Sequence, residues 1–93
     1  DLRKSSPTHG RYIAVELNAV NGQGLMIPKG MAHGFLALTE RVLMAYKVTS
    51  VYAPENDGGI RWDSFGFDWG IDQPIVSPRD CAHPALSDFD SPF

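Results

Sequence analysis

The sequence predicts an all-β domain of the sandwich or barrel kind. Apolar residues alternate with polar ones over several short segments, which is the two-residue period of a half-buried strand. Gly, Pro and Asn residues that favour turns separate these segments at close intervals. No stretch of ten or more residues carries a helical apolar stripe with caps. Short strands between such turns are typical of sandwiches and barrels.

The first expected strand is residues 11–19. Ile13, Val15 and Leu17 share one face of it. Glu16 lies on the other face, as in a strand with one buried side. The sequence NGQG follows at residues 21–24, and because its residues tolerate positive φ it predicts a tight turn.

The second and third expected strands are residues 24–28 and 33–40. Pro28 ends the second, because proline has no N–H to donate to a β-ladder. In the third, the alternation places His33 and Phe35 on the same side. A polar ring is thereby expected beside apolar neighbours.

The fourth expected strand, residues 41–53, is the longest. One of its faces carries Val42, Met44, Tyr46 and Val48. Residues 54–59 are expected to form a loop and residues 59–62 a short fifth strand. The rest of the chain is dense in Gly, Pro, Asp and Ser, which predicts irregular structure.

Composition limits the classes of function. With 93 residues, 43% of them hydrophobic, the chain is expected to be a single domain over residues 1–93. A net charge of −3 argues against a nucleic-acid partner, since binding phosphates needs a basic face. No apolar stretch is long enough to predict a membrane span. Cys81 is the only cysteine, so no internal disulfide is expected, which fits a cytoplasmic protein.

The amino end is unusual for a complete chain. It opens with DLRKSSPTHG and has no initiator Met. We therefore expect the chain to be a fragment, a processed product or an incompletely sequenced one.

Motifs for cofactors and metals are absent. The sequence has no glycine-rich phosphate loop and no G-x-S-x-G. His9, His33 and His83 lie far apart, without the spacing that brings two imidazoles to one metal. The sequence therefore predicts neither a cofactor nor a metal.

Three side chains remain candidates for chemistry, each with a structural alternative. Tyr46 lies on an apolar strand face, where its hydroxyl needs a partner, either backbone or ligand. Asp80 could begin a turn or cap a short helix. His33 could be a hydrogen-bonded structural residue or could face a ligand.

Five blocks of the sequence resemble one family. DLRKSSPTHG, IPKGMAHGF, AYKVTSVYAPENDGGIRW, GFDWG and IVSPRD occur in this order and at similar spacing in the dTDP-4-dehydrorhamnose 3,5-epimerases. The resemblance covers nearly all 93 residues but only the carboxyl-terminal half of such an enzyme. It implies a cupin-type jelly roll, incomplete in this chain, that works as a homodimer.

The resemblance also implies a reaction and roles. Family members are isomerases of the dTDP-L-rhamnose pathway that epimerise C3 and C5 of a dTDP-4-keto-6-deoxy sugar. A histidine held by an aspartate removes the protons, and a tyrosine on the opposite face of the sugar returns them. The tyrosine matches Tyr46 and the aspartate matches Asp80. His33 and Tyr52 match residues near the substrate, which favours the ligand-facing interpretation of His33.

The departures leave two functions open. The base histidine and the following lysine of the family belong to the half that is missing here, as do most residues that grip the thymidine. Met31 stands where an aromatic residue is common and Gly70 where proline is usual. The chain is therefore either the carboxyl half of an isomerase, or a non-catalytic cupin-like binding or assembly module.

Overall fold

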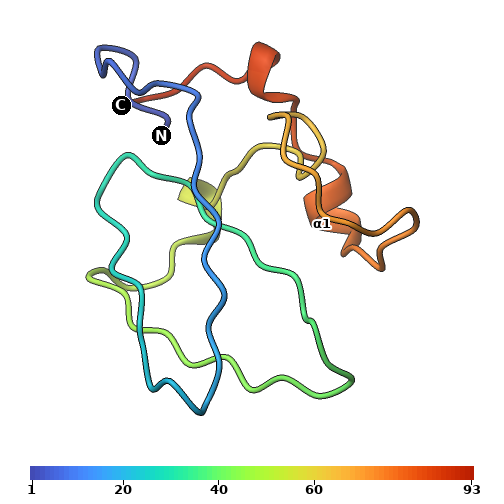
Figure 1. Cartoon of the computed structure of the whole chain (residues 1–93). Coiled ribbons are helices and arrows are strands. Elements are labelled where there is room, and N and C mark those ends of the chain that lie inside the picture. The colour runs from blue at the N-terminus through green and yellow to red at the C-terminus, as the bar shows by residue number, and fades with distance from the viewer.

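Three short helices are the regular elements of the chain, in a computed structural model that describes all of residues 1–93. They are the 3-10 helix η1 (Pro54–Asn56), the α-helix α1 (Pro78–Cys81) and the 3-10 helix η2 (Leu86–Asp88). Both η1 and α1 have a proline in the first turn. Proline is favourable there because an N–H in the first turn of a helix has no hydrogen-bond partner within the helix. Figure 1 shows that long open segments connect the rest of the chain.

The five predicted strands are wrong for this structure. Each of the expected segments is present as open chain, and no strand is assigned. The chain has 16 backbone–backbone hydrogen bonds, and none involves residues 12–27 or 32–52. A segment becomes a strand only when a neighbouring segment completes its ladder. Alternation of side chains is present here, but the ladder partner is not.

The two ends of the chain meet in what we call the terminal clasp, residues 1–4, 28–31 and 91–93. Leu2 N donates to Gly30 O at 2.9 Å, and Lys4 N donates to Phe93 O at 3.0 Å. Leu2 is 6% exposed and is the one buried hydrophobic residue. Figure 1 shows both termini side by side at the top of the view.

The carboxylate of Asp1 organises the amino-terminal turn. It accepts hydrogen bonds from the Arg3 side chain at 2.9 Å and from the hydroxyls of Ser6 and Thr8 at 2.6 Å. Bonds to a charged acceptor are among the stronger hydrogen bonds in proteins. These bonds hold the turn of residues 1–8 together, and Leu2 N connects it to Gly30.

A second packed region joins the start of the chain to residues 60–93. Tyr12, Phe65, Phe67 and Trp69 form an aromatic cluster with ring centroids 4.9 to 6.3 Å apart. Edge-to-face pairs at such distances are favourable. Trp69 Nε1 donates to Trp62 O at 2.9 Å. The indole N–H therefore has a hydrogen-bond acceptor while the ring packs in the aromatic cluster.

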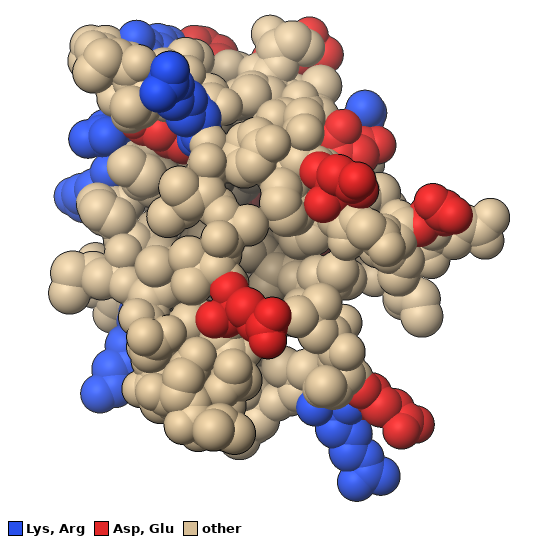
Figure 2. Space-filling view, in the orientation of Figure 1, with Lys and Arg blue, Asp and Glu red and all other residues tan.

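The middle of the chain, in contrast, is exposed. Only three of the 93 residues are buried, and they are Leu2, Gly30 and Ser91. The face in Figure 2 carries scattered acidic and basic groups among a large uncharged area. No helix of the chain has the length and apolar character needed to cross a membrane.

Candidate functional site

Two of the predicted site residues line one concavity, which we call the tyrosine hollow. Its volume is about 540 Å³, and its lining consists of Tyr46, Val48, Ser50, Val51, Tyr52, Ala53, Asn56 and Asp57. Four of these lining residues are the even-numbered residues 46–52, in the segment before η1. Helix η1 then turns the chain at Pro54, which brings Asn56 and Asp57 back against the tyrosines.

Both tyrosines are open to solvent. Tyr46 is 79% exposed and Tyr52 is 70% exposed, so the expectation that Tyr46 is a buried phenol is wrong for this structure. The reason is that no second layer covers the segment 41–53. Their hydroxyls are consequently available to a ligand rather than engaged in the interior.

Helix α1 holds the predicted aspartate through a cap. Ser77 is its N-cap, and its hydroxyl accepts a hydrogen bond from Asp80 N at 3.1 Å. An N-cap satisfies a backbone N–H that the first helical turn leaves without a partner. The structural alternative for Asp80, that it begins a turn or caps a short helix, is wrong in its position, because Asp80 lies inside α1 and Ser77 is the cap.

Arg79 connects this helix to the tyrosine hollow. Its guanidinium pairs with Asp57 at the edge of the hollow, and its Nη2 lies 3.2 Å from Asp80 Oδ1. We call these residues the Asp57–Arg79–Asp80 network. The charge of Asp57, with the hydrogen bond and charge of Asp80, raises the pKa of Arg79 above its ordinary value. The guanidinium is therefore a permanent positive charge between two carboxylates.

His83 is a neighbour of Asp80 that the sequence analysis did not predict. Its Nε2 lies 3.7 Å from Asp80 Oδ1, and its side chain is 18% exposed. A Cβ added to Gly59 would lie 3.0 Å from the same nitrogen, so Gly59 leaves room for the imidazole. The spacing of three residues between Asp80 and His83 was the signal that could have found this contact.

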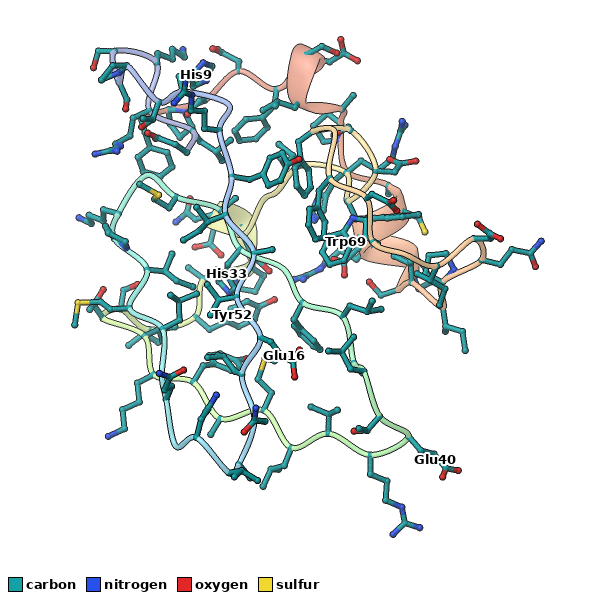
Figure 3. The ribbon with its side chains drawn as sticks, in the orientation of Figure 1. His9, Glu16, His33, Glu40, Tyr52 and Trp69 are labelled. Carbon is teal, nitrogen blue, oxygen red and sulfur yellow. The ribbon has the colours of Figure 1, made fainter.

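The structure brings together some of the predicted residues but not all. Tyr46 and Tyr52 share the hollow, and Asp80 reaches its edge through Arg79 and Asp57. His33 is exposed and is not part of the lining of this hollow. Figure 3 shows His33 and Tyr52 in the same central part of the view. The role of His33 is therefore still a prediction.

The arrangement offers proton donors and an orienting acceptor, but no metal centre. Tyrosine hydroxyls can donate a proton to a carbon or oxygen of a bound ligand. A carboxylate held on a helix can orient an imidazole. No group of three or more His, Cys, Asp or Glu side chains is placed to hold a metal ion.

Comparison with known proteins gives one consistent result. The family profile described as dTDP-4-dehydrorhamnose 3,5-epimerase matches residues 1–88. A protein of that name from Salmonella typhimurium is 43% identical over 89 residues, which cover 92% of this chain and 49% of the relative. Another from Methanothermobacter thermautotrophicus is 45% identical over 85 residues, 86% of this chain and 46% of the relative.

A third relative of the same name, from Sinorhizobium fredii, is 36% identical over 96 aligned residues, covering all of this chain and 49% of its own length. The chain thus spans about half the length of the curated relatives that it matches. No solved structure matches the chain.

Proposed function

The chain belongs to the dTDP-4-dehydrorhamnose 3,5-epimerase family, and from this premise we propose that it carries the proton donor and the orienting carboxylate of such an epimerase. Family membership implies a cupin fold. The 93 residues correspond in this proposal to the carboxyl-terminal half of the enzyme. The base histidine comes from the other half.

The proposed reaction converts dTDP-4-dehydro-6-deoxy-D-glucose to dTDP-4-dehydro-L-rhamnose. The C4 ketone makes the hydrogens at C3 and C5 acidic. An imidazole removes one of them, and the electron pair of the broken C–H bond passes to the ketone oxygen as an enolate. Tyr46 then gives its hydroxyl proton to the same carbon from the opposite face, which inverts its configuration. The imidazolium and the phenolate exchange protons with solvent before the second carbon reacts.

In this proposal the other residues orient the base histidine or contact the substrate. Asp80 would hold the base imidazole and stabilise its charged form, as carboxylates do in His–Asp pairs. Arg79 and His83 lie beside Asp80 Oδ1, which leaves Oδ2 to receive the base histidine. His33 and Tyr52 would contact the sugar nucleotide.

One observation carries the proposal. Tyr46 lines a hollow together with Tyr52 and Asp57. Asp57 in turn pairs with Arg79, the residue that precedes Asp80. Proton donor and orienting carboxylate are 34 positions apart in sequence, yet one side-chain network connects their sites. General acid–base assistance at such a site is worth about 10² to 10⁴ in rate.

The test joins the 93 residues to the amino-terminal half of the Salmonella typhimurium relative in one polypeptide. Product formation and deuterium uptake at C3 and C5 are followed in heavy water. We expect Asp80→Asn to lower turnover by roughly 10² to 10⁴, because the imidazole loses its orienting charge. In Tyr46→Phe, deuterium exchange should persist while the epimerised product is lost.

Two controls separate the assignments. His83→Gln should keep turnover within about tenfold of the parent, because the base is the histidine from the other half. A loss as large as that of Asp80→Asn would make His83 the base instead. Normal product formation by Tyr46→Phe contradicts the acid assignment. A folded but inactive parent polypeptide would favour the non-catalytic binding or assembly module.

A further inference from the structure

His83 is the least exposed of the ionisable side chains that meet at Asp80. Its side chain is 18% exposed, whereas that of Arg79 is 63% exposed. Arg61 N donates a hydrogen bond to Pro84 O at 2.8 Å, and this bond ties the residue after His83 to the segment that follows η1. The imidazole is therefore held in place beside the carboxylate, while the guanidinium lies mostly in solvent.

Gly59 provides the space in which this imidazole lies. A Cβ added to Gly59 would lie 3.0 Å from His83 Nε2 and 3.1 Å from its Cδ2, which is closer than an ordinary van der Waals contact. An added Cβ at the adjacent Gly58 would have no atom within 4 Å. Neither glycine has a positive φ, so a side chain at either position is limited by its neighbours and not by backbone conformation.

The partners of the Asp80 carboxylate all lie at one of its two oxygens. Arg79 Nε donates to Oδ1 at 3.3 Å, and its Nη2 lies 3.2 Å from the same atom. His83 Nε2 lies 3.7 Å from that oxygen as well. Because the χ2 torsion of an aspartate has only broad minima, the contacts at Oδ1 decide where Oδ2 points.

We propose that His83 is a positioning residue for the orienting carboxylate, which it holds at Oδ1 so that Oδ2 is presented to the base histidine. This inference rests on the proposed function, because it assigns a task to a further side chain of the same site. The imidazole acts through Asp80 and touches neither the base nor the reacting carbons. Arg79 is the weaker anchor of the two, because it is mostly exposed and also pairs with Asp57.

A double-mutant cycle in the joined polypeptide tests this role. His83→Gln removes the ring and its charge, so kcat should fall by about three- to fivefold, the upper range for losing a partly exposed ion pair. KM should stay the same, because this side chain does not contact the sugar nucleotide. In the Asp80→Asn background the same substitution should have no further effect, since the carboxylate that it holds is gone. A side chain that only supports the fold would lower turnover in both backgrounds.

Two matched glycine variants move the imidazole without changing its chemistry. Gly59→Ala should displace the ring from Asp80, because the new Cβ takes up its space. We expect it to reproduce the kcat loss of His83→Gln, and to add nothing to that loss when the two substitutions are combined. Gly58→Ala should turn over like the parent, since its Cβ meets no atom.

A spectroscopic measurement follows the contact separately from activity. With 15N-labelled histidine, the ring signals of His83 should shift in Asp80→Asn. The ring signals of His9 are the control, because His9 is exposed in the amino-terminal turn (Figure 3), away from α1. They should be the same in Asp80→Asn and in the parent.

Four results would overturn the inference while the proposed function stands. They are unchanged His83 ring signals in Asp80→Asn, a normal kcat for His83→Gln, equal losses from His83→Gln in both backgrounds, and a Gly59→Ala enzyme as active as Gly58→Ala. A rise in kcat would overturn it too, because the imidazole would then draw the carboxylate's charge away from the base. An inactive parent polypeptide, in contrast, would contradict the proposed function itself and this inference with it.

Discussion

At Gly30, backbone conformation and contact both exclude a larger residue. Its φ is +85°, in the left-handed region. A Cβ there would lie 2.5 Å from Arg3 Cγ and 3.6 Å from Phe93 Cβ. Both neighbours belong to the terminal clasp, so the absence of a side chain at Gly30 allows the two ends to meet.

Gly30→Ala should therefore open the clasp. The left-handed conformation alone costs a non-glycine residue about 1 to 2 kcal/mol, and Arg3 must also move. We expect the amides of Leu2 and Lys4 to exchange at least tenfold faster, measured by hydrogen exchange with NMR detection. Gly22→Ala is the control, because Gly22 has φ +60° but no atom within 4 Å of an added Cβ. Equal acceleration in both variants would contradict the steric explanation.

Lys4 of the clasp forms an ion pair with Asp90, the residue just before its last segment, and this pair depends on pH. Lys4 Nζ lies 2.6 Å from Asp90 Oδ1, and this hydrogen bond and charge lower the pKa of Asp90 below its ordinary value. The pair therefore stabilises the clasp above the ordinary carboxyl pKa of about 3.9. That contribution disappears as the pH falls through the lowered value.

A carboxyl NMR titration checks the assignment. In Lys4→Met the midpoint of Asp90 should move up toward the ordinary carboxyl value. The Asp63 carboxyl pairs with Arg61 instead, so its NMR signal at neutral pH should be the same in Lys4→Met and in the parent. An unchanged Asp90 midpoint would show that Lys4 does not cause the shift.

Sequence could single out Tyr46, Tyr52 and Asp80, because each lies in a block that matches the family. It could not supply the link from Asp57 to Arg79, because that contact spans 22 positions and depends on where η1 and α1 place their ends. The sequence could not predict the exposure of Tyr46 either. Alternation assigns a side chain to one face of a strand, but it does not say whether another layer of the protein covers that face.

At the scale of elements, α1 depends on its cap more than on its length. Four residues are far too few to form a helix by propensity alone. We expect Ser77→Ala to cost about 1 kcal/mol and to raise the exchange rate of the Asp80 amide about fivefold. Ser87→Ala is the control, because the Ser87 hydroxyl contacts the Asp88 side chain and no backbone N–H. Unchanged exchange in Ser77→Ala would mean that the cap does not hold the helix.

The strand predictions failed for an identifiable reason. Residues 11–19 and 41–53 have the alternation of strands, and sequence alone gave that pattern. Pairing requires a second segment at about 4.8 Å, and alternation does not say which segment that is. In this structure neither segment has such a partner, so the pattern is present without the ladder.

At the scale of the whole molecule, two packed regions hold the chain together. They are the terminal clasp and the aromatic cluster, and the segments between them are exposed. Tyr12 connects the start of the open segment to the cluster, because its ring contacts two phenylalanines and its hydroxyl donates to Gly66 O at 3.2 Å.

Tyr12→Ala should release this connection. Loss of two aromatic pairs, each worth about 0.5 to 1.5 kcal/mol, should make trypsin cleave after Arg11 at least about fivefold faster. Tyr52→Ala is the control, since Tyr52 is 70% exposed and belongs to no aromatic pair of the cluster. Mass spectrometry of timed digests gives both rates. Equal rates would show that the cluster does not restrain residue 11.

The aromatic cluster also gives the chain an optical reporter of its own state. Tyr12 and Trp69 both pack on Phe67, with ring centroids 5.4 and 4.9 Å from it. Light absorbed by this phenol is therefore passed to the indole by resonance energy transfer while the cluster is closed. When the cluster opens, phenol emission recovers and indole emission shifts to the red, so the intrinsic fluorescence spectrum follows opening without any added dye.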